Sequence, residues 1–452
     1  MENSEKFGNI LDLIDNKNFA AAKELLVDMN EINIALLLGD VEAEEMLIMF
    51  RLLPKTVAAE VFAFLSSDSQ RFIVSSFSDG ELASLLSDLF VDDLADLVEE
   101  MPANVVSKIL KNANEDTRKA LNTILQYPED SAGSLLTTEY VRLKQQFTVA
   151  EALSNIRRKG LKTETIYTCY VTNEARVLEG IVSLRDLVLA EPDQVLADIM
   201  TTDFVCVNTH DDQEYVAMIF KKHGFIALPV VDSEKRLVGI ITVDDIFDAL
   251  ESETTEDFQK MAALQPSEER YLDTSVFILA RHRIFWLLLL MLTETFTGGI
   301  IDHFTEVLQK CVLLTAFIPV LMDTGGNAGS QSSTLIIRGL ATGELATKDL
   351  GKILWKELQI GFVVSIILGS VMFMKNIFIG QKSFAVSLTV SCAIMTAVLI
   401  SKLTGAFLPI LAKKLKLDPA TMAAPIITTI VDTVSLLVYF SFAKLFIPEL
   451  SM

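Results

Sequence analysis

The sequence predicts a multidomain membrane protein: an all-α superhelical N-domain, two α+β repeats, a connecting helix and five transmembrane helices. Two observations predict this architecture. The 452 residues are 51% hydrophobic with a mean hydropathy of +0.40, yet long apolar runs concentrate in residues 284–447, whereas residues 1–270 are polar and acidic. One short pattern also occurs twice between residues 138 and 250, which indicates a duplicated module.

The charge of the chain excludes one class of partner. Asp and Glu number 60 against 38 Lys and Arg, which gives a formal charge of −22. Nucleic-acid binding needs clustered basic residues, so we expect no nucleic-acid partner. An acidic surface is either simply solvated or suited to Mg²⁺ and Ca²⁺, which prefer carboxylate oxygens. The N-terminus lacks a basic segment followed by an apolar one, so we expect no signal peptide and a cytosolic acidic half.

Cysteine usage predicts neither a disulfide framework nor a zinc site. The four cysteines are far apart and form no CxxC pair, the spacing on which either reading would depend.

Residues 1–130 are predicted to form a stack of short helices. Leu, Val and Phe recur at three- and four-residue spacing, and Asp, Ser or Pro interrupts the pattern about every 12 residues. This alternation is typical of a small α-solenoid.

Residues 131–250 contain the duplication, with repeats at about 138–196 and 197–250. The segments VLEGIVSLRDL (177–187) and RLVGIITVDDI (236–246) each combine an apolar strand, a glycine and a Ser/Thr-x-x-Asp turn into a helix. Gly180 and Gly239 are 59 residues apart, the length of a βαββα module. The pair resembles tandem CBS domains, which often bind nucleotides or ions.

A charged connecting helix at 251–282, with Pro266 as an expected break, leads into the transmembrane domain at 283–452. A transmembrane helix needs about 20 apolar residues. We expect five spans, at 284–302, 311–337, 354–378, 384–412 and 421–446.

Basic residues predict the orientation of these spans. Arg and Lys are more frequent in the loops on one side, which the positive-inside rule places in the cytoplasm. The residues on that side are Arg281, Arg283, Arg338, Lys348, Lys352, Lys356, Lys413, Lys414 and Lys416. We therefore expect a multi-pass protein of the cell (inner) membrane with the N-terminus inside and the C-terminus outside. An odd number of spans has no obvious two-fold repeat, so a pore is expected to need a second subunit.

Two polar features at membrane depth predict a cation pathway. The segment DTGGNAGSQSST (323–334) must face protein or water, because lipid offers no hydrogen bonds; close helix packing is its other interpretation. Asp432 lies in the last span, where a carboxylate costs at least about 2.5 kcal/mol. Thr428 and Thr429 are one turn earlier and Pro425 can free carbonyl groups. Glu294 is either a second polar point or a partner of a neighbouring helix.

The order of these parts, with PVLMDTGGNAGSQSSTLIIRGLA (319–341) and DPATMAAPIITTIVD (418–432), resembles the MgtE family of magnesium transporters over nearly the whole chain. The resemblance implies a homodimeric, Mg²⁺-selective, channel-like conduit rather than an enzyme. Asp432 would hold hydrated Mg²⁺, and Gly325, Gly326, Asn327 and Thr428 would line the pore.

The resemblance also implies closure by cytosolic Mg²⁺ that bridges carboxylates of the N-domain, the CBS pair and the connecting helix. The matching residues are Asp92, Asp96, Asp212, Glu214, Asp245, Asp248, Glu253, Glu256 and Asp257. Independently, Asp92 and Asp96 are spaced i, i+4 on one helix face and repel each other without cations.

Some positions depart from the family pattern. Gly224 replaces an acidic residue, Asp323 replaces a small residue of some members, and Ala424 replaces an Asn of some members. These differences leave open the selectivity between Mg²⁺ and Co²⁺.

Adenine nucleotides such as ATP are a further expected ligand. CBS pairs use a Ser/Thr-x-x-Asp turn against ribose, and Ser183 with Asp186 and Thr242 with Asp245 fit that pattern.

Two other functions are alternatives to a Mg²⁺ channel. A CBS-regulated carrier or channel for another ion would need a different pore chemistry, since an anion pathway would want basic residues or helix N-termini where this chain has Asp432. A membrane enzyme would want a second acid or a His close to Asp432, and only Glu294 is available. Both stay alternatives, with the divalent cation favoured.

Overall fold

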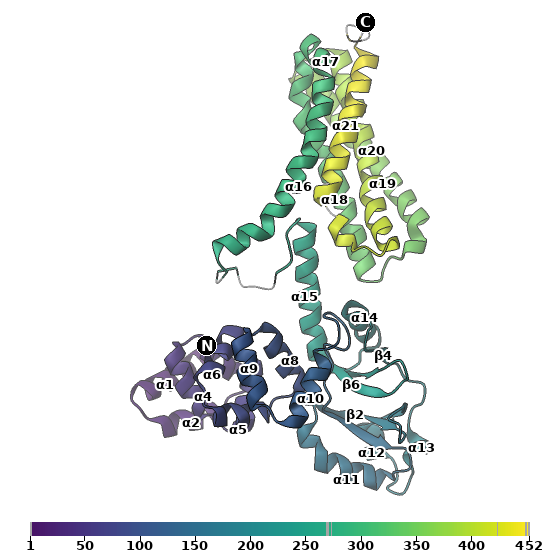
Figure 1. Ribbon diagram of the computed structural model, residues 1–452. Coiled ribbons are helices and arrows are strands. Elements are labelled where there is room, and N and C mark those ends of the chain that lie inside the picture. The colour runs from purple at the N-terminus through teal and green to yellow at the C-terminus, as the bar shows by residue number, and fades with distance from the viewer. Residues whose placement is uncertain (1, 268–270, 273, 423, 448–449, 451–452) are drawn as a thin grey trace. The chain divides into compact units, whose positions relative to one another are not determined.

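The computed structural model describes residues 2–267, 271–272, 274–422, 424–447 and 450. The chain divides into two compact units, Met1–Asp248 and Ala249–Met452. Figure 1 shows the helical and mixed parts of the first unit and the helical bundle of the second. Each unit is described by itself.

The first unit begins with a superhelix of short helices. From the second helix onward, each helix begins 12 residues after the previous one, as the spacing of apolar residues predicts. Their apolar faces are buried inside the stack, for example at Ile34, Leu37 and Phe62. The helices are α1 (Glu2–Asp15), α2 (Phe19–Val27), α3 (Glu31–Gly39), α4 (Ala43–Leu52), α5 (Lys55–Ala63), α6 (Ser67–Ser76), α7 (Asp79–Leu86), α8 (Val91–Glu100), α9 (Ala103–Asn112) and α10 (Glu115–Ile124).

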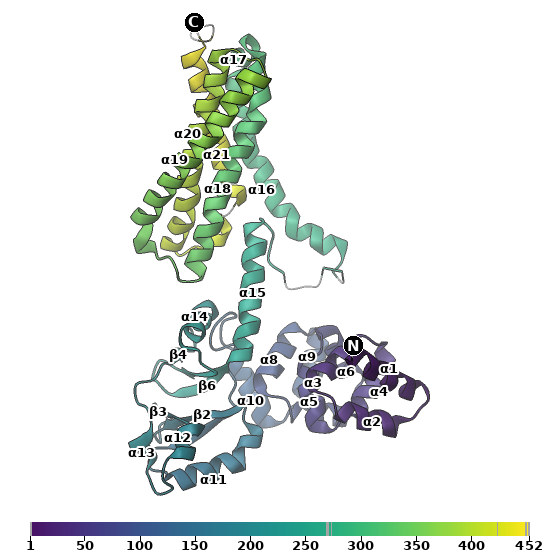
Figure 2. The same cartoon turned by 180° about the vertical axis from the view of Figure 1, so that it is seen from behind.

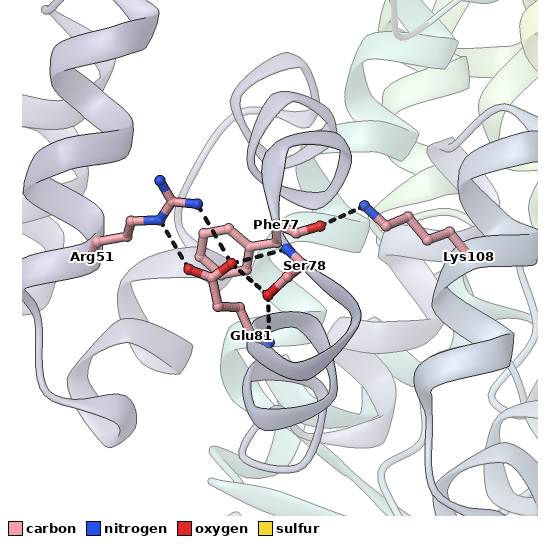
Figure 3. Close-up of polar contacts among 5 residues, drawn as sticks. All are labelled: Arg51, Phe77, Ser78, Glu81 and Lys108. Atoms are coloured by element: carbon pink, nitrogen blue, oxygen red, sulfur yellow. Dashed lines mark hydrogen bonds and ion pairs between the residues drawn. The ribbon is translucent and has the colours of Figure 1, made fainter.

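Polar contacts join helices that are not consecutive in the superhelix (Figure 3). Ser78 and Glu81 form a capping box at the start of α7, in which each side chain accepts a hydrogen bond from the backbone N–H of the other. Glu81 also pairs with Arg51 of α4 at 3.0 Å. Lys108 of α9 donates to the Phe77 carbonyl oxygen at 2.7 Å. One short helix end thus connects three layers of the stack.

Two three-stranded sheets follow, and they have the same topology. In each sheet the first strand pairs parallel with the second, and the second pairs antiparallel with the third. The first sheet contains β1 (Tyr140–Lys144), β2 (Thr165–Thr172) and β3 (Leu178–Ser183), and the second contains β4 (Val207–Asn208), β5 (Ala227–Val231) and β6 (Leu237–Thr242). The duplicated pattern therefore folds as two α+β modules.

The repeated glycines occupy the same place in both modules. Gly180 lies opposite Val171 and Gly239 lies opposite Val230 in the antiparallel registers. A side chain at Gly180 would collide with Met200, and one at Gly239 would collide with the Thr137 backbone. Both modules contribute to one core that includes Tyr170 and Ile240, so they pack together.

Helices flank the sheets and lead out of the first unit. They are α11 (Val149–Lys159), α12 (Leu184–Leu189), α13 (Leu196–Ile199), α14 (Gln213–His223) and α15 (Val243–Met261). The connecting helix α15 begins directly after β6 and ends five residues before Pro266, so the helix stops earlier than the expected break.

The second unit is a bundle of long helices (Figure 2). Helix α18 packs against α20 and α21, α19 packs against α20, and α16 contacts α21. The bundle contains α16 (Val276–His303), α17 (Thr305–Lys310), α18 (Ile318–Ala341), α19 (Leu350–Met374), α20 (Phe384–Lys414) and α21 (Ala424–Phe446). Short 3-10 turns at 312–317, 347–349 and 419–422 and a π-helical turn at 375–379 join them.

Four helices among the described residues are long and apolar enough to cross a membrane: Val276–His303, Thr347–Ile379, Phe384–Lys414 and Pro425–Phe446. They correspond to four of the five expected spans. The expected span at 311–337 is replaced by a 3-10 turn and by α18, whose 24 residues extend about 36 Å, enough to cross a hydrocarbon core. Because of its polar residues, α18 is not among the four helices that are apolar enough to cross a membrane.

Candidate functional site

One face of α18 carries a continuous polar stripe. Asp323, Asn327, Gln331, Thr334 and Arg338 follow each other at three- and four-residue intervals, and all are exposed in the single chain. The Asn327 amide donates to a carboxylate oxygen of Asp323 at 3.2 Å. In a bilayer such a face must meet water or protein, because lipid cannot satisfy its hydrogen bonds. The stripe, defined by these five residues, is the candidate lining of an aqueous pathway.

The opposite face of α18 is a close-packed contact with α21. A side-chain carbon at Gly325 would lie 2.9 Å from Val431, and one at Gly326 would lie 2.9 Å from Thr428. Both glycines are buried. Of the three residues of α18 expected to line a pore, only Asn327 is therefore exposed, while the two glycines allow α21 to approach.

Asp432 lies on α21 close to this contact. Its residue is only 8% exposed, and among the described residues its Oδ1 atom has no hydrogen-bond partner. The carboxylates of Glu294 and Asp323 are its repelling electrostatic neighbours. The structure thus brings together the three acidic positions that the sequence indicated at membrane depth.

The helix before Asp432 is tied by hydroxyl groups. Thr428 and Thr429 both donate to the carbonyl oxygen of Pro425, at 2.9 and 3.1 Å. Thr429 also contacts Thr293 of α16 at 3.5 Å, which places Glu294 beside α21. The side chain of Ala424 lies outside the described residues. The two bonds to Pro425 are the usual bonds of a helix hydroxyl to a carbonyl oxygen three or four residues earlier. A proline frees the carbonyl four residues before it rather than its own, so these bonds leave the expected carbonyl freed by Pro425 a prediction.

An acidic cluster lies where α8 faces the CBS pair. The cluster comprises Asp92, Asp93, Asp96, Glu164, Asp244 and Asp245. Burial raises the pKa of Asp92 well above its ordinary value, and repulsion from Asp245 and Asp93 raises it further. The loss of hydration and repulsion from Asp245 raise the pKa of Asp96 to about 7, although part of that residue is exposed. These carboxylates act on one another across the module boundary.

The CBS side of the cluster shows the same behaviour. Burial, followed by repulsion from Asp245, raises the pKa of Glu164 to about 8. Burial raises the pKa of Asp245 to about 7, although hydrogen bonds from Thr242 oppose the increase. Burial and then Asp244 raise the pKa of Asp93 to about 6. Carboxylates crowded in this way repel one another, and carboxylate oxygens are the ligands that hard divalent cations prefer.

The cluster is larger than the sequence indicated. Asp92, Asp96 and Asp245 were expected, whereas Asp93, Glu164 and Asp244 were not. Asp93 and Asp244 adjoin expected ligands in the sequence and could have been included on that ground. Glu164 stands in a loop before β2 without any periodic pattern, so only the fold identifies it.

Other expected ligands have local roles. Asp212 is the N-cap of α14 and accepts a hydrogen bond from the Glu214 backbone N–H at 2.9 Å. Gly224 ends the same helix with φ of +67°, a left-handed conformation that favours glycine over an acidic residue. The position where the family pattern has an acidic residue is therefore the C-cap of α14 in this chain.

A second acidic group lies in the other unit, at the end of the connecting helix. Lys260 pairs with Glu256 at 2.6 Å and with Asp418 at 2.7 Å. Burial alone would lower the pKa of Lys260, but these two carboxylates outweigh it and raise that pKa. Burial and then repulsion from Asp418 raise the pKa of Asp257. Met261 packs on Ile337 and Ala420, so the helix end is docked on the bundle.

The remaining expected ligands, Asp248 and Glu253, lie on α15, and both take part in polar or electrostatic interactions. Across the described part of the chain, no three His, Cys, Asp or Glu side chains lie close enough to form a ready-made metal centre. The carboxylates gather in groups but do not converge on a single point.

The two candidate nucleotide turns differ in accessibility. The Ser183 hydroxyl donates to Asp186 at 2.6 Å, and Asp186 is exposed. The Thr242 hydroxyl donates to Asp245, and Thr242 is only 6% exposed. Because Asp245 also belongs to the acidic cluster, the second turn has more negative surroundings than the first.

Known proteins match the chain in all its parts. The family described as MgtE intracellular N domain matches residues 29–130, CBS domains match residues 132–193 and 196–252, and MgtE, described as a divalent cation transporter, matches residues 318–442. Several relatives are named magnesium transporter MgtE. The one from Thermus thermophilus is 37% identical over 94% of this chain and 95% of its own length. The one from Bacillus subtilis is 32% identical over 91% and 94%.

Solved structures resemble the first half of the chain. The soluble part of a magnesium transporter superposes with a TM-score of 0.53 at 26% identity, covering 56% of this chain and 99% of that one. The cytosolic domain of the Mg²⁺ channel MgtE, in complex with ATP, gives a TM-score of 0.51 at 36% identity, with 54% and 99% covered. Since relatives match along nearly the full length and every domain in the same order, the chain belongs to the MgtE family of magnesium transporters.

Proposed function

We propose that the protein is a Mg²⁺-selective, channel-like transporter, in which hydrated Mg²⁺ passes between the membrane domains of two copies of the chain. The observation that carries this proposal is the exposed polar stripe of α18. A stripe of five polar residues on a helix of membrane length cannot rest against lipid. A second copy that covers the stripe would enclose it as an aqueous path.

Asp432 is the proposed ion-binding carboxylate of this path. Its unpartnered, buried oxygen and its acidic neighbours Glu294 and Asp323 favour a cation over an anion. Mg²⁺ gives up its water reluctantly and is often held through one or two carboxylates, so a site without converging ligands suits the hydrated ion. Within the stripe the basic residue is Arg338, near the helix end, which disfavours an anion pathway.

We further propose that cytosolic Mg²⁺ closes the pathway. The N-domain and CBS pair would lie in the cytoplasm, and the C-terminus outside, in the cell membrane. Ions that bridge α8 to Glu164 and Asp245 would replace repulsion by attraction. Each ion needs to favour the closed state by only about 1–3 kcal/mol for several to shift the population decisively.

The conduction proposal is tested by Mg²⁺ flux into liposomes that contain the purified protein, with Co²⁺, Ca²⁺ and Na⁺ as competitors and with chloride flux measured separately. Wild-type protein should admit Mg²⁺ and Asp432→Ala should not. If Asp432→Ala admits Mg²⁺ at the wild-type rate, Asp432 is not the ion-binding carboxylate of the pathway. Stronger flux of Co²⁺ or of an anion would instead support the alternative of a CBS-regulated channel for another ion.

The gating proposal is tested with paired charge removals in the N-domain. Asp92→Ala with Asp96→Ala should raise the cytosolic Mg²⁺ concentration that half-closes the channel. The matched control is Asp88→Ala with Asp116→Ala, which removes the same charge from exposed positions of the same domain. Equal half-closing concentrations for both double variants would show that α8 carries no sensor.

Adenine nucleotide is the proposed second ligand of the CBS pair, bound at the exposed Ser183–Asp186 turn. A solved relative's cytosolic domain is described in complex with ATP, which supports this ligand. Asp186→Ala should weaken ATP binding measured by calorimetry, and unchanged binding would move the ribose contact elsewhere.

A further inference from the structure

Two charged side chains are buried together inside the apolar bundle. Glu357 of α19 is 7% exposed and Lys402 of α20 is 5% exposed. Both stand in segments that otherwise qualify as membrane spans. Ionised groups at such depth are costly unless they are compensated. Neither residue belongs to the polar stripe of α18 or to the surroundings described for Asp432.

Both charges meet at one hydroxyl group of α18. Ser332, which is 1% exposed, donates to Oε2 of Glu357 at 2.6 Å. The Lys402 ammonium donates to the same Ser332 oxygen at 3.3 Å and to the Ala328 carbonyl oxygen at 3.5 Å. The directions are consistent, since a hydroxyl can donate its single proton to the carboxylate while it accepts from the ammonium.

This bridge has no net charge and joins three helices. Its members stand on α18, α19 and α20, so none can move along its helix axis without breaking a hydrogen bond in a low-dielectric setting, where such bonds are strong. A side-chain carbon at Gly361 of α19 would lie 3.7 Å from the Lys402 Cβ atom. That separation is an ordinary van der Waals contact, so α19 packs beside the stem of Lys402.

The bridge and the polar stripe lie on the same stretch of α18. Ser332 immediately follows Gln331 of the stripe, and neighbouring residues of an α-helix differ by about 100°. Rotation of α18 that separated Ser332 from its partners would also turn Asn327 and Gln331 away from their present direction. Close packing of Gly405 on the Gly329 backbone holds the same stretch of α18 against α20.

We propose that Lys402, Ser332 and Glu357 form a charge-compensated bridge that positions α18, and with it the pore-lining stripe, against the rest of the membrane domain. These are positioning residues, which act on the ion through the orientation of Asp323 and Asn327. The inference rests on the proposed pore.

The test compares two neighbouring serines of α18. Ser332→Ala removes the bridging hydroxyl, whereas Ser333→Ala removes a hydroxyl that is equally buried, at 1% exposure, and has no hydrogen-bond partner among the described residues. In the liposome flux assay, Ser332→Ala should change the half-saturating Mg²⁺ concentration by about fivefold or more and shift the ratio of Mg²⁺ to Co²⁺ flux. Ser333→Ala should change neither. Equal values for the two variants overturn the proposal, because a merely structural hydroxyl would alter only the amount of folded protein.

A second set of variants tests charge compensation. Lys402→Met alone should reduce the yield of folded protein in the membrane, since it leaves Glu357 uncompensated. Glu357→Gln with Lys402→Met should recover most of that yield. Lys414→Met, which removes an exposed cation of the same helix, is the control. A double variant that folds no better than Lys402→Met contradicts the bridge.

The failure of this inference differs from failure of the proposed pore. Asp432→Ala is measured in parallel. If it abolishes flux while Ser332→Ala behaves like Ser333→Ala, the pore stands and the bridge falls. If Asp432→Ala conducts like the wild type, the proposed pore itself is wrong.

Discussion

The proposed closure by Mg²⁺ should depend steeply on pH between 6 and 8, because protons and Mg²⁺ would compete for the acidic cluster. The cluster pKa values are raised in the docked arrangement of α8 and the CBS pair. Protonation therefore favours docking at low pH, and this contribution is lost as the pH rises through 6 to 8. Above that range a divalent cation must replace the protons. Acidification should thus close the channel without Mg²⁺ and weaken the binding of Mg²⁺.

The size of the effect follows from the individual groups. At pH 7, Asp96 and Asp245, with pKa values of about 7, each hold about half a proton, and Glu164, with a pKa of about 8, holds about 0.9. Binding of cations to the cluster should therefore release roughly two protons or more at pH 7, since the pKa of Asp92 is also raised, and the apparent affinity for Mg²⁺ should increase steeply with pH. For Asp245 alone, the increase from 3.8 to about 7 corresponds to up to about 4 kcal/mol.

Calorimetry of the full chain in nanodiscs, in buffers of different ionisation enthalpy, measures this proton release directly. Glu164→Gln should lower the release by nearly one proton. Glu179→Gln removes a half-buried glutamate of the same module outside the cluster and should leave it unchanged. A release near zero for the wild-type protein at pH 7 would refute the interpretation of the cluster as a cation sensor.

Two further predictions concern the second unit. Lys260→Met removes the ammonium that pairs with both Glu256 and Asp418, so the contact of α15 with the bundle should depend more strongly on Mg²⁺. The Mg²⁺ concentration that half-closes the channel should rise about two- to fivefold, because partly exposed ion pairs contribute up to about 1 kcal/mol. An unchanged concentration would mean that these ion pairs do not contribute to closure. Gly405→Ala places a carbon against the Gly329 carbonyl, so it should destabilise the bundle by about 1–3 kcal/mol. The measurement is a lower thermal unfolding temperature in detergent. An unchanged unfolding temperature would mean that α18 and α20 can move apart at no cost in free energy.

Local patterns predicted most of the fold. The 12-residue spacing of the first helices and the duplicated glycine-containing strands both reappear in the structure, because each reports a repeated packing unit. Helix α18 was harder to delimit, since the expected span at 311–337 mixes a 3-10 turn with a helix that begins at Ile318. Hydropathy alone cannot separate a turn from a helix within one apolar run.

The candidate sites were only partly predictable. The i, i+4 pair Asp92 and Asp96 and the turn residue Asp245 could be recognised from local spacing, and the structure brings them near one another. Glu164 could not, because its approach depends on how α8 meets a loop that lies far away in sequence. The sequence does contain a signal for Lys402, because a cation in the middle of an apolar span requires a partner. The fold identifies that partner as Ser332 together with Glu357.

The weak hydropathy of α18 has a consequence for the insertion of the protein into the membrane. A helix that presents a row of polar groups partitions poorly into lipid when it leaves the translocon alone. We therefore expect its integration to wait for later segments, with Lys402 and Glu357 neutralising each other as their helices assemble around it. If two copies enclose the stripe as proposed, a single nascent copy would expose these polar groups to lipid, and we would then expect pairing to occur early in biogenesis.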